Sequence, residues 1–371
     1  MKFIKHRVLF ICLIPIVILL LGLSRSSENI TESTVAVRER QKGVCWVGGR
    51  RDVDELPFKE LRQKNVQWIS QTPFGWQPSH DSPEISLGWR GSNNTERRDK
   101  GVVRTTELAR KEGIKTILKP HIWLRNADTH WRGDIAMTTN GDWEVWFSNY
   151  EKFILHYARL AESLQIEILC IGTELHQTCK SKNENWVELI AKIRKVYSGK
   201  LTYAANFDQE YEDIQFWNLL DFIGIQAYFP LSENENPTLA ELKEGWSTPI
   251  SKLKRFSNEH KKPVLFTEIG YKSTKGAAIE PWKWPQQIDQ GERKAIYSEE
   301  TQALCYEAMF QTVWKETWLA GIYLWKWYPN FNQIRARGNQ SQEDLKNYFN
   351  IDFTPQNKEA EEVMQKWYGL E

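Results

Sequence analysis

The chain has 371 residues, enough for one large domain or two medium-sized ones. Its 49 basic and 48 acidic residues nearly cancel to a formal net charge of +1, which gives no support for a nucleic-acid or anionic-lipid partner. Tryptophan is abundant, with 18 residues. These side chains either fill the corners of a large core or line a groove that stacks on sugar rings, and composition does not separate the two.

The five cysteines show neither a CxxC motif nor a Cys/His pattern at metal-binding spacing. Cys45 and Cys170 fall in predicted core strands and Cys305 in a predicted helix, so we expect buried free thiols there. Cys179 falls in a predicted loop, and its exposure stays open. No disulfide framework is indicated.

The N-terminus has the composition of an export signal. Residues 1–7 are basic, residues 8–23 form an apolar run, and polar residues follow. The run is short for a membrane-spanning helix, yet no clear cleavage site follows it. We therefore predict a signal peptide or signal-anchor over residues 1–23 and a polar tether over residues 24–40. An exported protein, either secreted or anchored to a membrane by this segment alone, is the expectation.

From residue 41 onward, short apolar runs alternate with segments of helical periodicity. Strands are predicted over 43–47, 66–71, 114–118, 166–175, 201–205, 222–227, 264–267 and 322–325. Helices are predicted over 54–64, 102–112, 146–164, 186–196, 239–258, 297–319 and 358–367. A long polar loop over 77–99 is of the kind that usually carries function.

Eight strands that each lead into a helix-sized segment predict a (β/α)8 TIM barrel, as a single domain over residues 41–371. The alternative is an open doubly wound sheet. It is less favoured because residues 48–50 (GGR), after the first strand, lack the G-x-G-x-x-G pattern of a phosphate-binding turn.

Two glutamates stand at matching ends of predicted strands. Glu174 closes the fourth strand and Glu268 follows the seventh, each directly after a threonine. Active sites of TIM barrels lie at this end of the strands, so both carboxylates can point at the barrel axis. A pair about 5–5.5 Å apart suits retaining glycoside hydrolysis, and a gap of about 6.5–9.5 Å suits inversion. Either glutamate alone could equally be a salt-bridge partner or a loop anchor.

Five motifs, in this order and spacing, resemble those of the clan A glycoside hydrolases, and most closely glycoside hydrolase family 113. They are residues 119–123 (KPHIW), 171–175 (IGTEL), 266–271 (FTEIGY), 324–327 (LWKW) and 353–358 (FTPQNK). The resemblance covers residues 41–370. It implies a retaining endo-β-1,4-mannanase without a cofactor, with Glu174 as acid/base and Glu268 as nucleophile.

The same resemblance suggests a role for Tyr228, which ends the sixth strand and would donate a hydrogen bond to Glu268. Trp325 is the candidate platform under the sugar at the cleaved bond, with Trp327 as the alternative. Further candidates for binding sugar are His121, Trp123, Asn206, Trp76, Trp282 and Trp284. For the rim tryptophans, packing within a loop is an equally good interpretation.

Two positions depart from the clan pattern. Thr173 stands where many members have an asparagine that binds the sugar 2-hydroxyl, and Asn206 is a possible substitute. The arginine that many members place after the second strand has no clear match, although Arg90 and Arg98 are candidates. These departures bear on sugar specificity more than on the class of reaction.

Other functions remain as alternatives: a clan A glycosidase for another sugar, or a carbohydrate-binding barrel without activity. A metal-dependent barrel hydrolase is disfavoured because no His-x-His follows the first strand. We expect an oligo- or polysaccharide substrate, no metal, no nucleic acid and a monomer. The sugar, the endo or exo mode and the processing of the N-terminus stay open at this stage.

Overall fold

The computed structural model describes residues 39–47, 53–87, 95–127, 129–331, 334 and 341–370. Eight parallel strands close into a barrel in the order β1-β10-β9-β8-β7-β6-β4-β2. These strands are β1 (Gln41–Trp46), β2 (Trp68–Gln71), β4 (Lys115–Leu118), β6 (Ile168–Thr173), β7 (Lys200–Asn206), β8 (Ile223–Gln226), β9 (Val264–Ile269) and β10 (Leu319–Trp327). The predicted (β/α)8 barrel is confirmed, with all eight strands where the apolar runs placed them.

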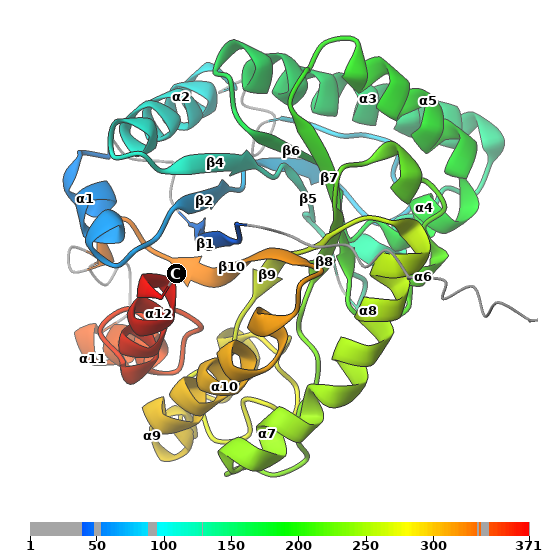
Figure 1. Ribbon diagram of the computed structural model, residues 1–371. Coiled ribbons are helices and arrows are strands. Elements are labelled where there is room, and N and C mark those ends of the chain that lie inside the picture. Colours follow the sequence, from blue (N-terminus) through cyan, green and yellow to red (C-terminus); the bar gives the residue numbers. More distant parts are fainter. Residues whose placement is uncertain are drawn as a thin grey trace, which may run out of the picture. The chain divides into compact units, whose positions relative to one another are not determined.

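Helices surround the barrel (Figure 1). They are α1 (Leu56–Gln63), α2 (Thr95–Lys111), α3 (Asn140–Ser163), α4 (His176–Ser181), α5 (Asn183–Arg194), α6 (Glu210–Asp213), α7 (Leu239–Gly245), α8 (Ser247–His260), α9 (Arg293–Ile296), α10 (Glu299–Gln311), α11 (Gln342–Asn350) and α12 (Glu359–Gly369). Strands such as β6, β9 and β10 are buried along their whole length because one face packs inside the barrel and the other against these helices. This double burial explains why the sequence shows continuous apolar runs.

The helix predicted over 239–258 is wrong in one respect, because it is two helices. α7 ends at Gly245 and α8 begins at Ser247. Pro249 has no backbone N–H and cannot donate to the carbonyl of residue 245, which interrupts the helical ladder at that point. Gly245 also lies against the backbone of Leu231, where a Cβ would come within 2.1 Å of the carbonyl oxygen.

The helix predicted over 297–319 is also too long. α10 ends at Gln311, a 3-10 turn occupies Val313–Lys315, and β10 already begins at Leu319. Apolar residues recur through the turn and into the strand, and no glycine or proline marks the end of the helix, so the sequence contains no stop signal at Gln311.

A second, two-stranded sheet extends the barrel in segments that directly follow β2 and β4 and that the predicted strands did not include. β3 (Phe74–Gln77) pairs in parallel with β5 (His121–Leu124). They follow β2 and β4 after Pro73 and Pro120, and because proline cannot donate to the ladder, each strand is interrupted there. The sheet places His121 and Trp123 on the same face, two residues apart.

The described cysteines and the N-terminal segment remain to be compared with the predictions. Cys179, which was predicted in a loop, is buried in α4, because this helix packs against the 3-10 turn Arg132–Asp134, α5 and α6. The described cysteines, Cys45, Cys170, Cys179 and Cys305, are free thiols. In the described part of the chain no helix is both long and apolar enough to cross a membrane. The predicted signal or anchor over 1–23 and most of the tether lie outside the described residues.

Candidate active site

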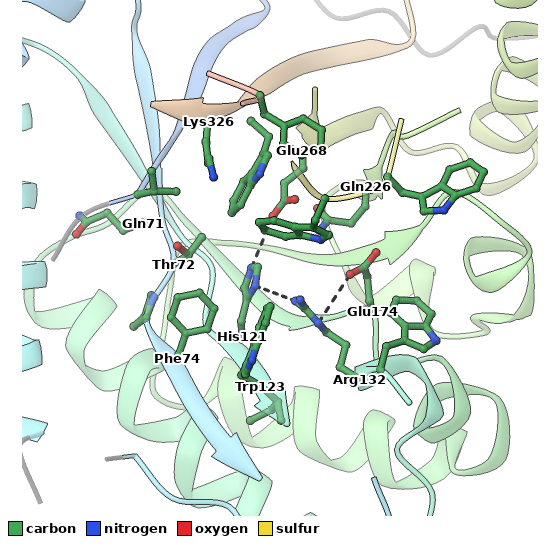
Figure 2. Close-up of a pocket in the computed structure, with 18 of the residues that line it drawn as sticks. Gln71, Thr72, Phe74, His121, Trp123, Arg132, Glu174, Gln226, Glu268 and Lys326 are labelled. Carbon is green, nitrogen blue, oxygen red and sulfur yellow. Dashed lines mark hydrogen bonds and ion pairs between the residues drawn. The ribbon is translucent and has the colours of Figure 1, made fainter. Parts of the chain in front are cut away.

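A cavity of about 1570 Å³ opens at the carboxyl ends of the barrel strands (Figure 2). It brings together ten residues that the sequence singled out as candidates for the site: Trp76, His121, Trp123, Glu174, Asn206, Tyr228, Glu268, Trp282, Trp284 and Trp325. These side chains come from seven of the eight barrel strands or the segments after them, so closure of the barrel is what assembles the site.

Glu268 lies inside β9 and is held by a cation. Lys119, fully buried at the end of β4, places its Nζ 2.5 Å from Glu268 Oε1. The same ammonium donates to the carbonyl of Thr267 at 3.0 Å. Tyr228 Oη donates to the other carboxylate oxygen, Oε2, at 2.9 Å. Burial, and secondly the charge of Glu268, raise the pKa of Tyr228 well above its ordinary value, so the phenol remains a donor.

Arg132 connects the two glutamates through His121. Its Nη1 lies 3.0 Å from His121 Nδ1, and its Nε lies 3.9 Å from Glu174 Oε2. Burial, together with the charges of Lys119 and Arg132, lowers the pKa of His121 well below its ordinary value. A neutral His121 that accepts at Nδ1 carries its proton on Nε2, which faces Glu268 Oε1 at 3.9 Å. Figure 2 shows this chain of contacts across the cavity.

Glu174 has a different environment. It directly follows β6 in the left-handed backbone region, with φ +51°, and its N–H donates to the carbonyl of Ala204 at 2.9 Å. A non-glycine residue in this region costs about 1–3 kcal/mol and persists where its surroundings over-determine it. The turn aims the carboxyl into the cavity, where Asn206 Nδ2 donates to Oε1 at 2.8 Å.

The pKa of Glu174 is raised above its ordinary value. Burial is the largest cause, and the negative charge of Glu268 acts in the same direction. Arg132, Asn206 and Lys119 act in the opposite direction. The balance favours a carboxyl that holds a proton at a higher pH than an exposed glutamate does.

Asn206 supports Glu174, whereas the sequence suggested it as a substitute for the missing asparagine at position 173. Its Oδ1 accepts from the N–H of Asp208 at 2.9 Å, which orients the amide so that Nδ2 faces Glu174. Thr173 is buried, and its Oγ1 lies 3.9 Å from the Sγ of Cys170.

Aromatic side chains form one wall of the cavity. Trp325 lines it, and its ring makes an edge contact with Trp284 at a centroid distance of 6.0 Å. Trp327 is buried in the main core and does not line the cavity. Of the two candidate tryptophans, Trp325 is therefore the one that a bound sugar could contact. Lys326, between them, lines the cavity and pairs with the buried Asp352 at 3.2 Å.

The rim of the cavity carries tryptophans that are partly open to solvent. Trp123 is 38% exposed and Trp282 is 42% exposed, the latter stacked on Phe207 at 5.5 Å. Trp76 lies beside Trp123 across the β3–β5 pairing. Arg132 lies over the ring of Trp123 at 5.2 Å. Large, partly exposed rings beside polar groups suit the C–H faces and hydroxyls of sugars.

Sequence reasoning missed Arg132 and Lys326, which line the cavity, and Lys119, which is fully buried and pairs with Glu268. Lys119 and Lys326 lie inside quoted motifs, and the signal for each was a lysine in an otherwise apolar strand end. Arg132 lies in a 3-10 turn (Arg132–Asp134) far from any strand end, and nothing in its neighbourhood marks it.

The cation that pairs with Glu268 is a lysine and not the arginine candidate Arg98. Arg98 lines the cavity and donates to the carbonyl of Phe74 at 2.6 Å, whereas Lys119 is the cation paired with Glu268. The other candidate, Arg90, lies outside the described residues.

The chain is similar to known glycoside hydrolases. The model of glycoside hydrolase family 113 matches residues 51–348. A GH113 β-1,4-mannanase structure is 25% identical with a TM-score of 0.71, covering 90% of this chain and 100% of that one. A GH113 β-mannanase from Alicyclobacillus acidocaldarius, in complex with ManMIm, is 25% identical with a TM-score of 0.72, covering 89% and 97%.

A hyperthermostable endo-1,4-β-D-mannanase from Thermotoga petrophila shares the fold, with 12% identity and a TM-score of 0.57 over 89% of this chain and 99% of that one. No curated protein sequence matches the chain.

Proposed function

Because the chain belongs to glycoside hydrolase family 113 and is a glycoside hydrolase, we propose that it is a retaining endo-β-1,4-mannanase. Glu268 is the nucleophile and Glu174 is the acid/base. The observation that carries the proposal is the pair of glutamates that face one cavity from β9 and the end of β6, with unlike neighbours.

The environment of Glu268 suits a nucleophile. Lys119 and Tyr228 occupy one carboxylate oxygen each, which fixes the orientation of the side chain. An ion pair of this kind, shielded from water, presents an anion to the developing positive charge of the sugar ring. In the first step an oxygen of Glu268 forms a bond to the anomeric carbon, and the bond to the leaving oxygen breaks.

The environment of Glu174 suits an acid that later acts as a base. Its raised pKa keeps the proton that the leaving oxygen requires as that bond breaks. In the second step the ionised Glu174 takes a proton from water, whose oxygen attacks the anomeric carbon and releases Glu268. The proton returns to Glu174 and the cycle closes.

The aromatic cavity supports a polysaccharide substrate. Trp325 offers a platform close to the carboxylates, while Trp123 and Trp282 on the rim can contact sugars further along a chain. The two GH113 structures at 25% identity are both β-mannanases, which supports β-1,4-mannan as the polymer and cleavage within the chain.

The test has two parts. Hydrolysis of β-mannan, β-glucan and β-galactan is compared by product analysis, and the first-formed anomer is read by NMR. We expect mannan to be cleaved to oligosaccharides whose first-formed anomer is β. A mechanism-based 2-deoxy-2-fluoro-mannoside is then mapped by peptide mass spectrometry, with the label expected on Glu268. A first-formed α anomer, or a label elsewhere, would contradict the mechanism.

A matched control separates this role from a general need for glutamate. Glu167 stands just before β6, at the end opposite Glu174, and its Oε2 accepts from the N–H of Thr116 at 2.9 Å. Glu167→Gln should retain activity, while Glu174→Gln should lose it. Equal loss in both variants would argue against the assignment of Glu174.

Export is also part of the proposal, because polymeric mannan does not enter cells and residues 1–23 have the composition of a signal or anchor. Fractionation of cells that express the full chain tests it, with activity expected in the membrane or the medium. Activity confined to the cytosol would contradict it.

A further inference from the structure

Behind the Glu174 side of the cavity lies a third carboxyl, Glu210, which does not line the cavity and is fully buried at the start of α6. Its Oε1 accepts from Tyr203 Oη at 2.6 Å, and its Oε2 accepts from the backbone N–H of Asn206 at 2.6 Å. Both oxygens are therefore engaged by groups from β7.

Each of these hydrogen bonds leads on to Glu174. Tyr203 Oη also accepts from the backbone N–H of Leu175 at 2.6 Å, immediately after Glu174. Asn206 Nδ2 donates to the carboxyl of Glu174 at 2.8 Å. Through Tyr203, the buried carboxyl of Glu210 fixes the peptide that follows Glu174. Through Asn206, it fixes the side chain of Glu174.

The backbone at Glu174 requires such support. Its φ of +51° lies in the left-handed region, which a glutamate occupies only when neighbouring contacts fix it. The N–H of Glu174 is bound to Ala204, and the N–H of Leu175 is bound to Tyr203. Without the second contact, the N–H of Leu175 would lose its partner and the strained turn would lose one of the hydrogen bonds that fix it.

The local sequence makes room for this arrangement. At Gly172 a Cβ would lie 2.6 Å from the ring of Tyr203 and 2.9 Å from that of Trp186, so only glycine lets the tyrosine pass behind β6. The N–H of Asp208 donates to Asn206 Oδ1 at 2.9 Å, which closes the turn that returns the chain to Glu210.

We propose that Glu210 is a positioning residue for the acid/base: acting through Tyr203 and Asn206, it fixes both the backbone turn and the carboxyl orientation of Glu174. The proposal rests on the proposed function of Glu174. Burial raises the pKa of Glu210 to about 8, against the hydrogen bonds from Tyr203 and Asn206. The carboxyl is thus mostly uncharged at neutral pH and places little second negative charge beside Glu174.

The test exploits the fact that only a poor leaving group needs an acid. The value of kcat/KM is measured for mannopentaose, whose leaving group is a sugar hydroxyl, and for the 2,4-dinitrophenyl β-glycoside of mannobiose, whose leaving group needs no proton. Glu210→Gln and Tyr203→Phe are compared with the parent, and Glu174→Ala serves as the reference for complete loss of the acid. Melting temperatures are recorded for every variant.

Tyr197→Phe is the matched control. Tyr197 is equally buried, and its Oη donates to the backbone carbonyl of Ile166 at 2.7 Å, beyond the opposite end of β6. Its loss removes a buried tyrosine hydroxyl of the same kind without touching the cavity. We expect it to leave both kcat/KM values within about twofold of the parent, since it changes no contact of the carboxyls.

For Glu210→Gln and Tyr203→Phe we expect kcat/KM on mannopentaose to fall about 10- to 100-fold, since small misplacements of a catalytic group have effects of this size. On the dinitrophenyl substrate it should fall less than about threefold, because proton donation by Glu174 contributes nothing there. Equal losses on the two substrates, or no loss in either folded variant, would overturn the proposal. If Glu210→Gln fails to fold, Tyr203→Phe decides alone.

Failure of the underlying function would look different. If the parent does not cleave mannopentaose, or if Glu174→Ala loses activity equally on both substrates, then Glu174 is not the acid, and the positioning role falls with it. If Glu174→Ala discriminates between the substrates while Glu210→Gln and Tyr203→Phe do not, the function stands and only the positioning proposal is overturned.

Discussion

Glu268 and Glu174 face the same cavity but are held in opposite ways. Glu268 lies within a regular strand beside a buried ammonium, 2.5 Å away. Glu174 lies in a left-handed turn, its carboxyl bound to an uncharged amide and 3.9 Å from the nearest cation that contacts it, Arg132. Two chemically identical side chains can therefore take different roles, because a close cation favours the anion whereas burial favours the protonated acid.

The largest expected effect is the loss of activity when either glutamate is replaced by alanine. We expect Glu268→Ala to lose activity on the order of 10⁵-fold, as for nucleophiles in other covalent mechanisms. Azide should rescue the two alanine variants with opposite stereochemistry. Glu174→Ala should yield the β-mannosyl azide, formed from the covalent intermediate, and Glu268→Ala the α-mannosyl azide, formed by direct displacement. NMR of the azide products checks this, and the reverse pattern would exchange the two assignments.

A variant of Lys119 tests how strongly the buried cation stabilises the Glu268 carboxylate. Lys119→Met should reduce the free energy of unfolding by about 3–5 kcal/mol, because it leaves the buried Glu268 carboxylate without its cation. Chemical denaturation measures it.

The exposed pair Lys192–Glu151, at 2.7 Å, supplies the control, and Lys192→Met should cost about 1 kcal/mol or less. Combining Lys119→Met with Glu268→Leu should recover part of the loss. Additive losses in the double variant would show that the pair is not coupled.

Glu210, which supports Glu174, allows the effect of burial on a carboxyl to be tested through the pH dependence of the free energy of unfolding. Burial raises its pKa to about 8 in the folded chain, above the ordinary 4.5, so the unfolded chain releases this proton at lower pH. Between about pH 4.5 and 8 this group therefore reduces stability as pH rises, by up to about 1.4 kcal/mol per pH unit.

Glu210→Gln removes that dependence. Relative to the parent, the variant should thus become more stable as pH rises from 5 to 8. Unfolding free energies at three pH values across this range measure it, and a difference that is constant with pH would contradict the raised pKa.

The smallest expected effect concerns the proton on Glu174. Activity requires the protonated acid, so kcat/KM falls as pH rises through the pKa of Glu174. Arg132 and Asn206 both lower that pKa, and Arg132 has the larger effect. Arg132→Gln should therefore move the basic limb of the profile to higher pH, and Asn206→Ala should move it in the same direction by less. A basic limb that stays in place or moves to lower pH would show that another group sets it.

Sequence alone was sufficient for the barrel, because strands buried on both faces require apolar runs and parallel pairing requires a helix between them. It was also sufficient to place Glu174 and Glu268 at one rim, since the ends of parallel strands meet at the same edge of the barrel. Among the neighbours of these carboxyls, Tyr228 was expected from the resemblance as a donor to Glu268, and the structure has this contact at 2.9 Å. Lys119 and Arg132 were not visible, because they come from other parts of the chain.

Only the tertiary structure decided which groups touch these carboxyls. Lys119 and Arg132 are far from the glutamates in sequence and pair with them through barrel closure and loop packing. Glu210 reaches Glu174 only through Tyr203 and Asn206. The same holds for Trp325 over Trp327, which differ by two residues but lie in different environments. Periodic patterns encode which residues are buried, whereas contacts between side chains of different strands depend on the register and the turns that bring them together.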